Sequence, residues 1–340
     1  MTDSDQEDLP PTTMPSTVGV SVQGFDNEEA ARRLGHTVLS VVSTLGSFID
    51  LSQLDGITIG IDYDAALASV DRGIPGLHPL TRSNSEEMQG VAMSPAVMRD
   101  GGVRTHLVFS AERLVPLIWE GEEIQQEDRD MSVGLIAHEC AHVQVTAEKE
   151  RAIPEARVGT RIEGYERAVM FQIAEICWDE YAVCRLSARF APQQSRTHAD
   201  TVVACAKVGR DQSDDAIRAY RVHGDVGRLI DEAARPLVQP IKAAAYLLGS
   251  MDGEGLEWSD LPEVRTVLEE NDYAELVDAL WTELRRLWDT RDQWGDTLAV
   301  FASLEKIAKR LFDSGGLFFK TDPQGNCRID VPFTANTMSV

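Results

Sequence analysis

The sequence predicts an α+β protein that is mostly helical, with a small antiparallel sheet in its first third. Apolar residues recur at helical spacing over several long stretches, which indicates amphipathic helices. A few short stretches alternate apolar with small or polar residues, which is typical of strands. Hydrophobic residues make up 43% of the 340 residues, enough to bury a sizeable core.

The first third of the chain alternates between predicted helix and predicted strand. Residues 1–20 are acidic and rich in Pro, Thr and Ser, which indicates a disordered tail. We expect a helix over about 27–49 and a strand over 56–63. Two further strands, 89–98 and 103–110, flank a turn that contains Asp-Gly, so they should form a hairpin.

Long helices are predicted for most of the remaining chain. One of them contains the pair His138 and Glu139 and should end near Arg151, before Pro154. A second helix is expected over about 162–190. Five more helices and a terminal hairpin follow, at about 199–208, 213–221, 225–249, 262–287, 294–313 and 315–333.

Charge and cysteine content restrict the partners and the compartment. The chain has 32 Lys and Arg against 56 Asp and Glu, a formal net charge of -24. This balance repels phosphate backbones, so no nucleic-acid partner is expected. Five cysteines without a Cys-x-x-Cys pair favour reduced thiols over a disulfide framework. The sequence contains no signal peptide and no apolar run that is long enough to span a bilayer, so we expect a cytoplasmic protein without a membrane partner.

The stretch GLIAHECAHVQ (134–144) contains His138, Glu139 and His142 in the spacing H-E-x-x-H. Two histidines four residues apart lie on one face of a helix, so their imidazole nitrogens can converge on one Zn²⁺ ion. Glu139 lies about 100° further round the helix, where it can reach a water molecule that the metal activates. The spacing therefore predicts zinc ligands at the two histidines and a general base at Glu139.

The neighbours of the motif are apolar, which separates it from a chance pattern on a surface helix. Val133, Leu135 and Ile136 precede it, and a buried helix that carries three polar side chains must give them partners. Cys140 stands two residues from each histidine and points away from a metal held by them. We interpret Cys140 as a small core residue.

A catalytic zinc site needs a third protein ligand. Glu148 would supply it in the pattern H-E-x-x-H-x-x-G-x-x-H, but Val145 stands at the glycine position, so Glu148 is interpreted as a surface residue. On the second long helix, Glu180 interrupts a stripe of apolar and small residues, and a carboxylate there needs a counter-charge from a metal or from a residue such as Arg185. Glu175 lies about 140° off that stripe and stays open as an alternative ligand.

HECAH followed by a helix that carries a Glu resembles the gluzincins, which are zinc metallopeptidases with two His and one Glu as ligands. The compact strand and helix pattern, with DEYAVCRLSA (179–188), is similar to the intracellular ImmA/IrrE-like metallopeptidases. The resemblance covers about residues 27–190; Ala141 stands where the family often has Gly. It implies a zincin-like core, Zn²⁺ held by His138, His142 and Glu180, and peptide hydrolysis with Glu139 as general base.

The resemblance also implies a domain organisation and a partner. We expect a disordered acidic tail at 1–20, a zincin-like metallopeptidase core at 21–195, a helical C-terminal region at 196–313, and a small hairpin and tail at 314–340. An edge strand at 103–110 should pair with an extended peptide or protein substrate. Two other functions stay open, namely a zincin-fold metalloprotein with a binding or regulatory role and little hydrolysis, and a helical interaction protein with an incidental motif.

Peptide hydrolysis also calls for a donor that stabilises the oxyanion. Four side chains are candidates, and the sequence does not choose among them: Tyr165, Tyr181, His106 and His223.

Overall fold

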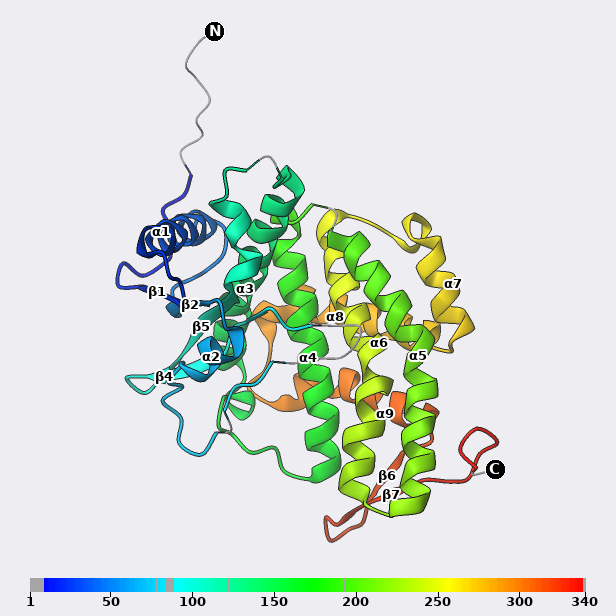
Figure 1. The fold of residues 1–340 in the computed structure, drawn as a ribbon. Coiled ribbons are helices and arrows are strands. Elements are labelled where there is room, and N and C mark those ends of the chain that lie inside the picture. Colours follow the sequence, from blue (N-terminus) through cyan, green and yellow to red (C-terminus); the bar gives the residue numbers. More distant parts are fainter. Residues whose placement is uncertain (1–8, 78, 83–88, 122, 193, 339–340) are drawn as a thin grey trace. The chain divides into compact units, whose positions relative to one another are not determined.

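The computed structural model describes the chain from residue 9 to residue 338, apart from 78, 83–88, 122 and 193. Part of the predicted disordered tail, residues 1–8, lies outside the described residues. The described chain divides into two compact units (Figure 1). The first unit contains residues 1–148 and 189–192, and the second contains residues 149–188 and 193–340.

A mixed five-stranded sheet forms the centre of the first unit. Three strands are parallel to one another, and two short strands run antiparallel to the third. The prediction of an antiparallel sheet therefore holds only for these two short strands, and the other pairings are parallel. The strands are β1 (Val20–Gln23), β2 (Leu54–Gly60), β3 (Ala92–Met93), β4 (Ala96–Arg99) and β5 (Gly102–Ser110), in the order β1-β2-β5, with β3 and β4 both beside β5.

The parallel pairing follows from the connection between β1 and β2. Helix α1 (Glu28–Leu45) joins them, and a helical crossover returns the chain in the same direction. The Asn27 side chain caps α1 by accepting hydrogen bonds from two main-chain N–H groups of its first turn. Strand β1 was absent from the predicted elements, and with it the parallel register was missed. The short helix α2 (Tyr63–Ala68) follows β2.

Strand β5 lies inside the sheet, so the prediction that 103–110 is an edge strand is wrong. It pairs with β2 on one side and with β3 and β4 on the other. Asp100 and Gly101 both adopt positive φ, at 51° and 79°, and this tight turn folds β4 back onto β5. The predicted Asp-Gly hairpin is confirmed, and β3 and β4 form the sheet boundary beside β5.

Helix α3 (Gln126–Ala152) contains the H-E-x-x-H motif and ends before Pro154, as predicted. Gly134 lies four residues before His138, which is about one helical turn. A Cβ atom on Gly134 would lie 2.9 Å from the Cβ of Ala191. The segment 189–192 therefore packs directly against the helix backbone. Phe190 of this segment also contacts Phe48, with ring centroids 5.6 Å apart. The segment 189–192 therefore contacts both α3 and Phe48 within the first unit.

The second unit is helical, with one small hairpin. The expected helices at 199–208 and 213–221 are one continuous helix, which runs through Gly209. The expected helix at 262–287 is interrupted near Asp272, which adopts positive φ. The elements are α4 (Tyr165–Ser187), α5 (Gln194–His223), α6 (Val226–Glu254), α7 (Pro262–Glu270), α8 (Ala274–Thr290), α9 (Ala302–Ser314), β6 (Phe318–Thr321) and β7 (Cys327–Asp330).

Helices α4, α5 and α6 lie side by side in the second unit (Figure 1, green to yellow-green). Glycine allows α6 to approach α4 closely. A Cβ atom on Gly249 would overlap the carbonyl oxygen of Tyr181 and lie 2.8 Å from the Cβ of Cys184. The backbones of the two helices are therefore nearly in contact at this level, which fixes the side chains that they direct toward each other.

Candidate metal centre

His138 and His142 lie on the same face of α3. Their ring centroids are 5.0 Å apart, and the ring planes meet at 79°. His138 is buried, with 8% of its surface exposed. The apolar residues between and around them are also buried, as the sequence predicted, among them Ile136, Cys140 and Val143. The helix therefore presents two imidazoles from a buried segment, and neither is an incidental surface histidine.

Glu139 is buried beside a serine from the sheet boundary. The Ser94 hydroxyl donates to Oε2 of Glu139 at 2.6 Å and also lies 3.1 Å from the main-chain oxygen of Glu139. Ser94 directly follows β3, and the pairing of β3 with β5 fixes its position. Glu139 itself is 5% exposed. A buried carboxylate needs such donors, and this one holds the acid in a defined orientation.

Tyr63, the first residue of α2, is a further buried polar group near Glu139. Burial raises the pKa of its hydroxyl well above the usual range, and the negative charge of Glu139 raises it further. The hydroxyl has no hydrogen-bond partner among the described residues. The Arg82 guanidinium lies over its ring, 5.0 Å from the centroid. Neither Tyr63 nor Ser94 could be predicted from the sequence, because each is a single polar residue far from the motif along the chain.

The structure brings three of the predicted site residues together. His138, His142 and Glu180 each offer one ligand atom, and these three atoms lie within 4.8 Å of one another. No other group of three or more His, Cys, Asp or Glu residues in the described part of the chain has this property. Two imidazoles and one carboxylate are a common donor set for catalytic zinc.

The donor set also fits one ion in size. Ligand atoms bonded to a tetrahedral zinc at 2.0–2.2 Å lie about 3.3 Å apart. The three ligand atoms here lie within 4.8 Å of one another, so the group could hold a metal ion.

Glu180 projects from α4 within the apolar stripe that the sequence indicated. Its side chain is 12% exposed, and its neighbours Cys177, Val183 and Cys184 are almost fully buried. Burial raises the pKa of the Cys177 thiol to about 12, so this cysteine stays protonated at neutral pH. The Nζ atom of Lys242 lies 3.7 Å from Oε1 of Glu180.

Glu175, the alternative ligand, is engaged elsewhere. Its carboxylate accepts a hydrogen bond from Nζ of Lys149 at 2.6 Å, and Asp179 accepts a second one at 3.1 Å. The Lys149 side chain is 8% exposed, and its two carboxylate partners hold its pKa above the usual range against the effect of burial. Glu148 accepts a hydrogen bond from Gln144 on its own helix. Neither glutamate belongs to the metal-ligating group.

Arg185, the considered counter-charge for Glu180, has other partners. It donates to the Tyr181 hydroxyl at 2.6 Å and lies 3.5 Å from Oδ2 of Asp252. Tyr181 in turn donates to Asp252 at 2.5 Å and is fully buried. Tyr181, one of the candidate oxyanion donors, is therefore part of a buried polar network of the second unit.

The other candidate oxyanion donors also have structural surroundings. His106 lies between Asp55 and Thr58, with ring nitrogens at 3.0 and 2.9 Å from their oxygens. Tyr165 is 51% exposed. His223 accepts a hydrogen bond from a main-chain N–H two residues further on. The structure provides no argument that favours one of them.

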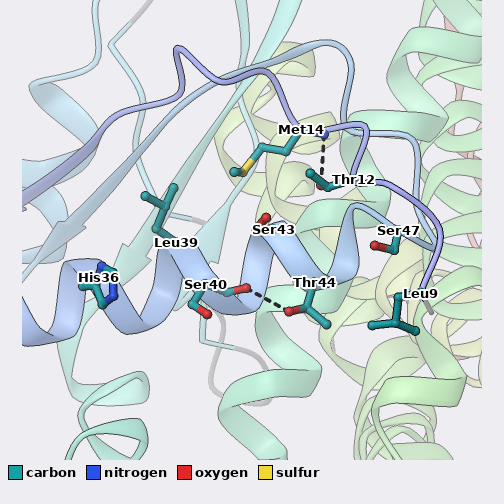
Figure 2. A pocket seen from close by; sticks show the side chains of 9 residues that line it. All are labelled: Leu9, Thr12, Met14, His36, Leu39, Ser40, Ser43, Thr44 and Ser47. Carbon is teal, nitrogen blue, oxygen red and sulfur yellow. Dashed lines mark hydrogen bonds between the residues drawn. The ribbon is translucent and has the colours of Figure 1, made fainter. Parts of the chain in front are cut away.

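A cavity of about 490 Å³ lies elsewhere in the first unit, between α1 and the segment that precedes β1 (Figure 2). Its hydrogen bonds are local, such as that from the Thr44 hydroxyl to the main-chain oxygen of Ser40. None of the motif residues lines it. The lining residues are Leu9, Thr12, Met14, His36, Leu39, Ser40, Ser43, Thr44 and Ser47.

No family model matches the chain, and no curated protein or solved structure is significantly similar to it. The candidate metal centre therefore rests on the geometry and the donor chemistry of its own residues. Within the described part of the chain, no helix has the length and apolar character needed to cross a bilayer.

Proposed function

We propose that this protein is a zinc-dependent peptidase, with His138, His142 and Glu180 as metal ligands and Glu139 as general base. The observation that carries the proposal is the grouping of those three ligand atoms within 4.8 Å. Glu139 follows one ligand directly in the sequence, so it is close to the metal without being part of the ligand group. In this proposal residues 21–195 form the metallopeptidase core, and the protein acts in the cytoplasm, where its five free cysteines stay reduced.

His138, His142 and Glu180 would hold the zinc ion, which would supply Lewis-acid activation of a water molecule and of a carbonyl group. Glu139 accepts the proton of the attacking water and then donates it to the nitrogen of the leaving amine. The Ser94 hydroxyl donates a hydrogen bond to Oε2 of Glu139. Ser94 thereby orients the carboxylate, and a fixed orientation lowers the cost of reaching the reactive geometry.

The proposed substrate is a peptide or a protein segment in extended conformation. Strand β3 ends the described order of the sheet, and Ser94, which contacts Glu139, follows it directly. A peptide that adds to this edge would be bound through main-chain hydrogen bonds, with little demand on its side chains. This edge replaces 103–110 as the proposed binding strand.

The test compares wild type with Glu139→Gln in zinc content and in hydrolysis of a peptide library. Glutamine keeps the shape of the side chain but cannot accept the proton, so activity should fall by roughly 10²–10⁴ while about one zinc per chain is retained. Glu127→Gln, an exposed acid in the first turn of the same helix, serves as the matched control and should behave as wild type. A zinc-loaded wild type that cleaves no peptide would favour the binding or regulatory alternative. A wild type that takes up no zinc would favour an incidental motif.

A further inference from the structure

Lys242 of α6 faces Glu180 across the closely packed interface between α4 and α6. Its Nζ atom lies 3.7 Å from Oε1 of Glu180, and the two side chains are 24% and 12% exposed. Lys242 stands seven residues before Gly249, which is almost two helical turns, so both residues lie on the α6 face that approaches α4. The close approach of the backbones at Gly249 fixes the distance between the helices. The ion pair is therefore part of the packed structure.

Lys242 is flanked along α6 by buried apolar residues. Its chain neighbours Ile241 and Ala243 are 2% and 1% exposed, and its Nζ atom lies 5.7 Å from the centre of the Tyr246 ring. An ammonium group in such a position is costly unless a counter-charge compensates it. Glu180 supplies that counter-charge, and the Tyr246 ring adds a weaker attraction for the cation.

Two lysines pair with the three acidic groups along this part of α4. Lys149 neutralises Glu175 and Asp179, while Lys242 lies beside Glu180. Only Glu180 also belongs to the group that can ligate a metal. One carboxylate thus has two cationic partners available, the ammonium of Lys242 and the metal ion.

We infer that Lys242 is the counter-charge of Glu180 in the metal-free protein, and that it competes with zinc for this carboxylate. The inference rests on the proposed metal site. It assigns to α6, which lies outside the region of the family resemblance, a role in setting metal affinity. Lys242 balances the charge of Glu180 in the metal-free protein, and it lowers the affinity for zinc.

The size of the effect follows from the distance. A zinc ion bonded to Oε1 of Glu180 at about 2.0–2.2 Å lies at most about 6 Å from Nζ of Lys242. Repulsion between a unit charge and a dication at that distance weakens binding about tenfold even at the dielectric constant of water. Removal of the ammonium group should therefore tighten zinc binding by about a factor of ten or more.

The experiment measures the zinc dissociation constant by competition with a chelating dye, and thermal unfolding in the presence of EDTA. Lys242→Met keeps the aliphatic chain and should bind zinc about tenfold more tightly, with a lower Tm when metal-free, because Glu180 loses its counter-charge. Lys242→Gln is a second neutral variant with the same expectation, and Lys242→Arg should stay near wild type. Lys309→Met, which removes a lysine paired with Asp313 on α9, is the matched control and should leave zinc affinity unchanged.

The outcomes separate the inference from the proposed function. If wild type binds zinc and both neutral variants bind it equally or more weakly, the inference is overturned while the metal site stands. If wild type binds no zinc, the proposed function fails, and the competition fails with it. Tighter binding by both neutral variants, with unchanged affinity in Lys242→Arg and Lys309→Met, supports the inference.

Discussion

Exchange of single carboxylates on α4 distinguishes the metal ligand from its neighbours. Glu180→Gln removes the charged oxygen ligand but keeps the volume of the side chain and its place in the helix. Glu175→Gln makes the same chemical change five residues earlier. The two variants are therefore matched, and only the first should change metal binding.

The expected magnitudes follow from what each carboxylate contacts. Loss of a partner that only supports a ligand typically lowers metal affinity 10–100-fold, so loss of Glu180 itself should lower zinc affinity by at least about 10². Glu175 contacts Lys149 at 2.6 Å and does not belong to the metal-ligating group. Glu175→Gln should leave zinc affinity within about twofold of wild type, since Asp179 still pairs with Lys149.

The assay is a zinc titration of chelator-treated protein, with the metal content after dialysis as a second readout. Circular dichroism of the metal-free proteins checks that both variants keep the helical fold. The ligand assignment is refuted if Glu175→Gln loses zinc while Glu180→Gln retains it. Equal loss in both variants would mean that the whole acidic face of α4, and no single residue, determines binding.

Two further substitutions test the surroundings of the site. Ser94→Ala should retain zinc but lower peptide hydrolysis about tenfold, because Glu139 loses the hydrogen bond that orients it, and Ser94→Thr should restore most of the rate; full activity in Ser94→Ala would rule out the orienting role. Lys149→Met should destabilise the metal-free protein by about 3 kcal/mol in urea unfolding, because Glu175 and Asp179 would lose their buried counter-charge. An unchanged unfolding midpoint would show that water or another cation compensates these carboxylates.

The helices of the site could be predicted from the sequence because their signals are long and local. The motif helix carries its apolar flanks within a few residues of the histidines, and its predicted end near Arg151 agrees with the observed end at Ala152. Helical geometry likewise favoured Glu180 and left Glu175 open, because an apolar stripe over six turns can be recognised despite individual exceptions. The structure places Glu180 with the two histidines and leaves Glu175 with Lys149.

The parallel pairing in the sheet and the hydrogen bond between Ser94 and Glu139 could not be predicted from the sequence. Strand β1 has only four residues and follows an acidic segment, so it has almost no periodicity to detect, although it decides that the sheet contains parallel strands. Ser94 contacts Glu139 across 45 positions of sequence. Its role depends on the pairing of β3 with β5, and a single serine in a short strand gives no local signal of that pairing.

The pairing of acids and lysines along α4 shows why local sequence could suggest a ligand but not its regulation. Asp179 and Glu180 are adjacent, yet about 100° of helical rotation separates their side chains. One of them reaches Lys149 and the other reaches Lys242, which lies more than sixty positions further along the chain. A carboxylate whose lysine is itself deeply buried and shared with a second acid is a fixed structural element, because no other group could replace the cation. The Nζ atom of Lys242 lies farther from Glu180, at 3.7 Å, than that of Lys149 lies from Glu175, at 2.6 Å, and Lys242 is also the more exposed lysine. On this difference in pairing we infer that Glu180 is the carboxylate of the helix that can exchange its lysine for a metal ion.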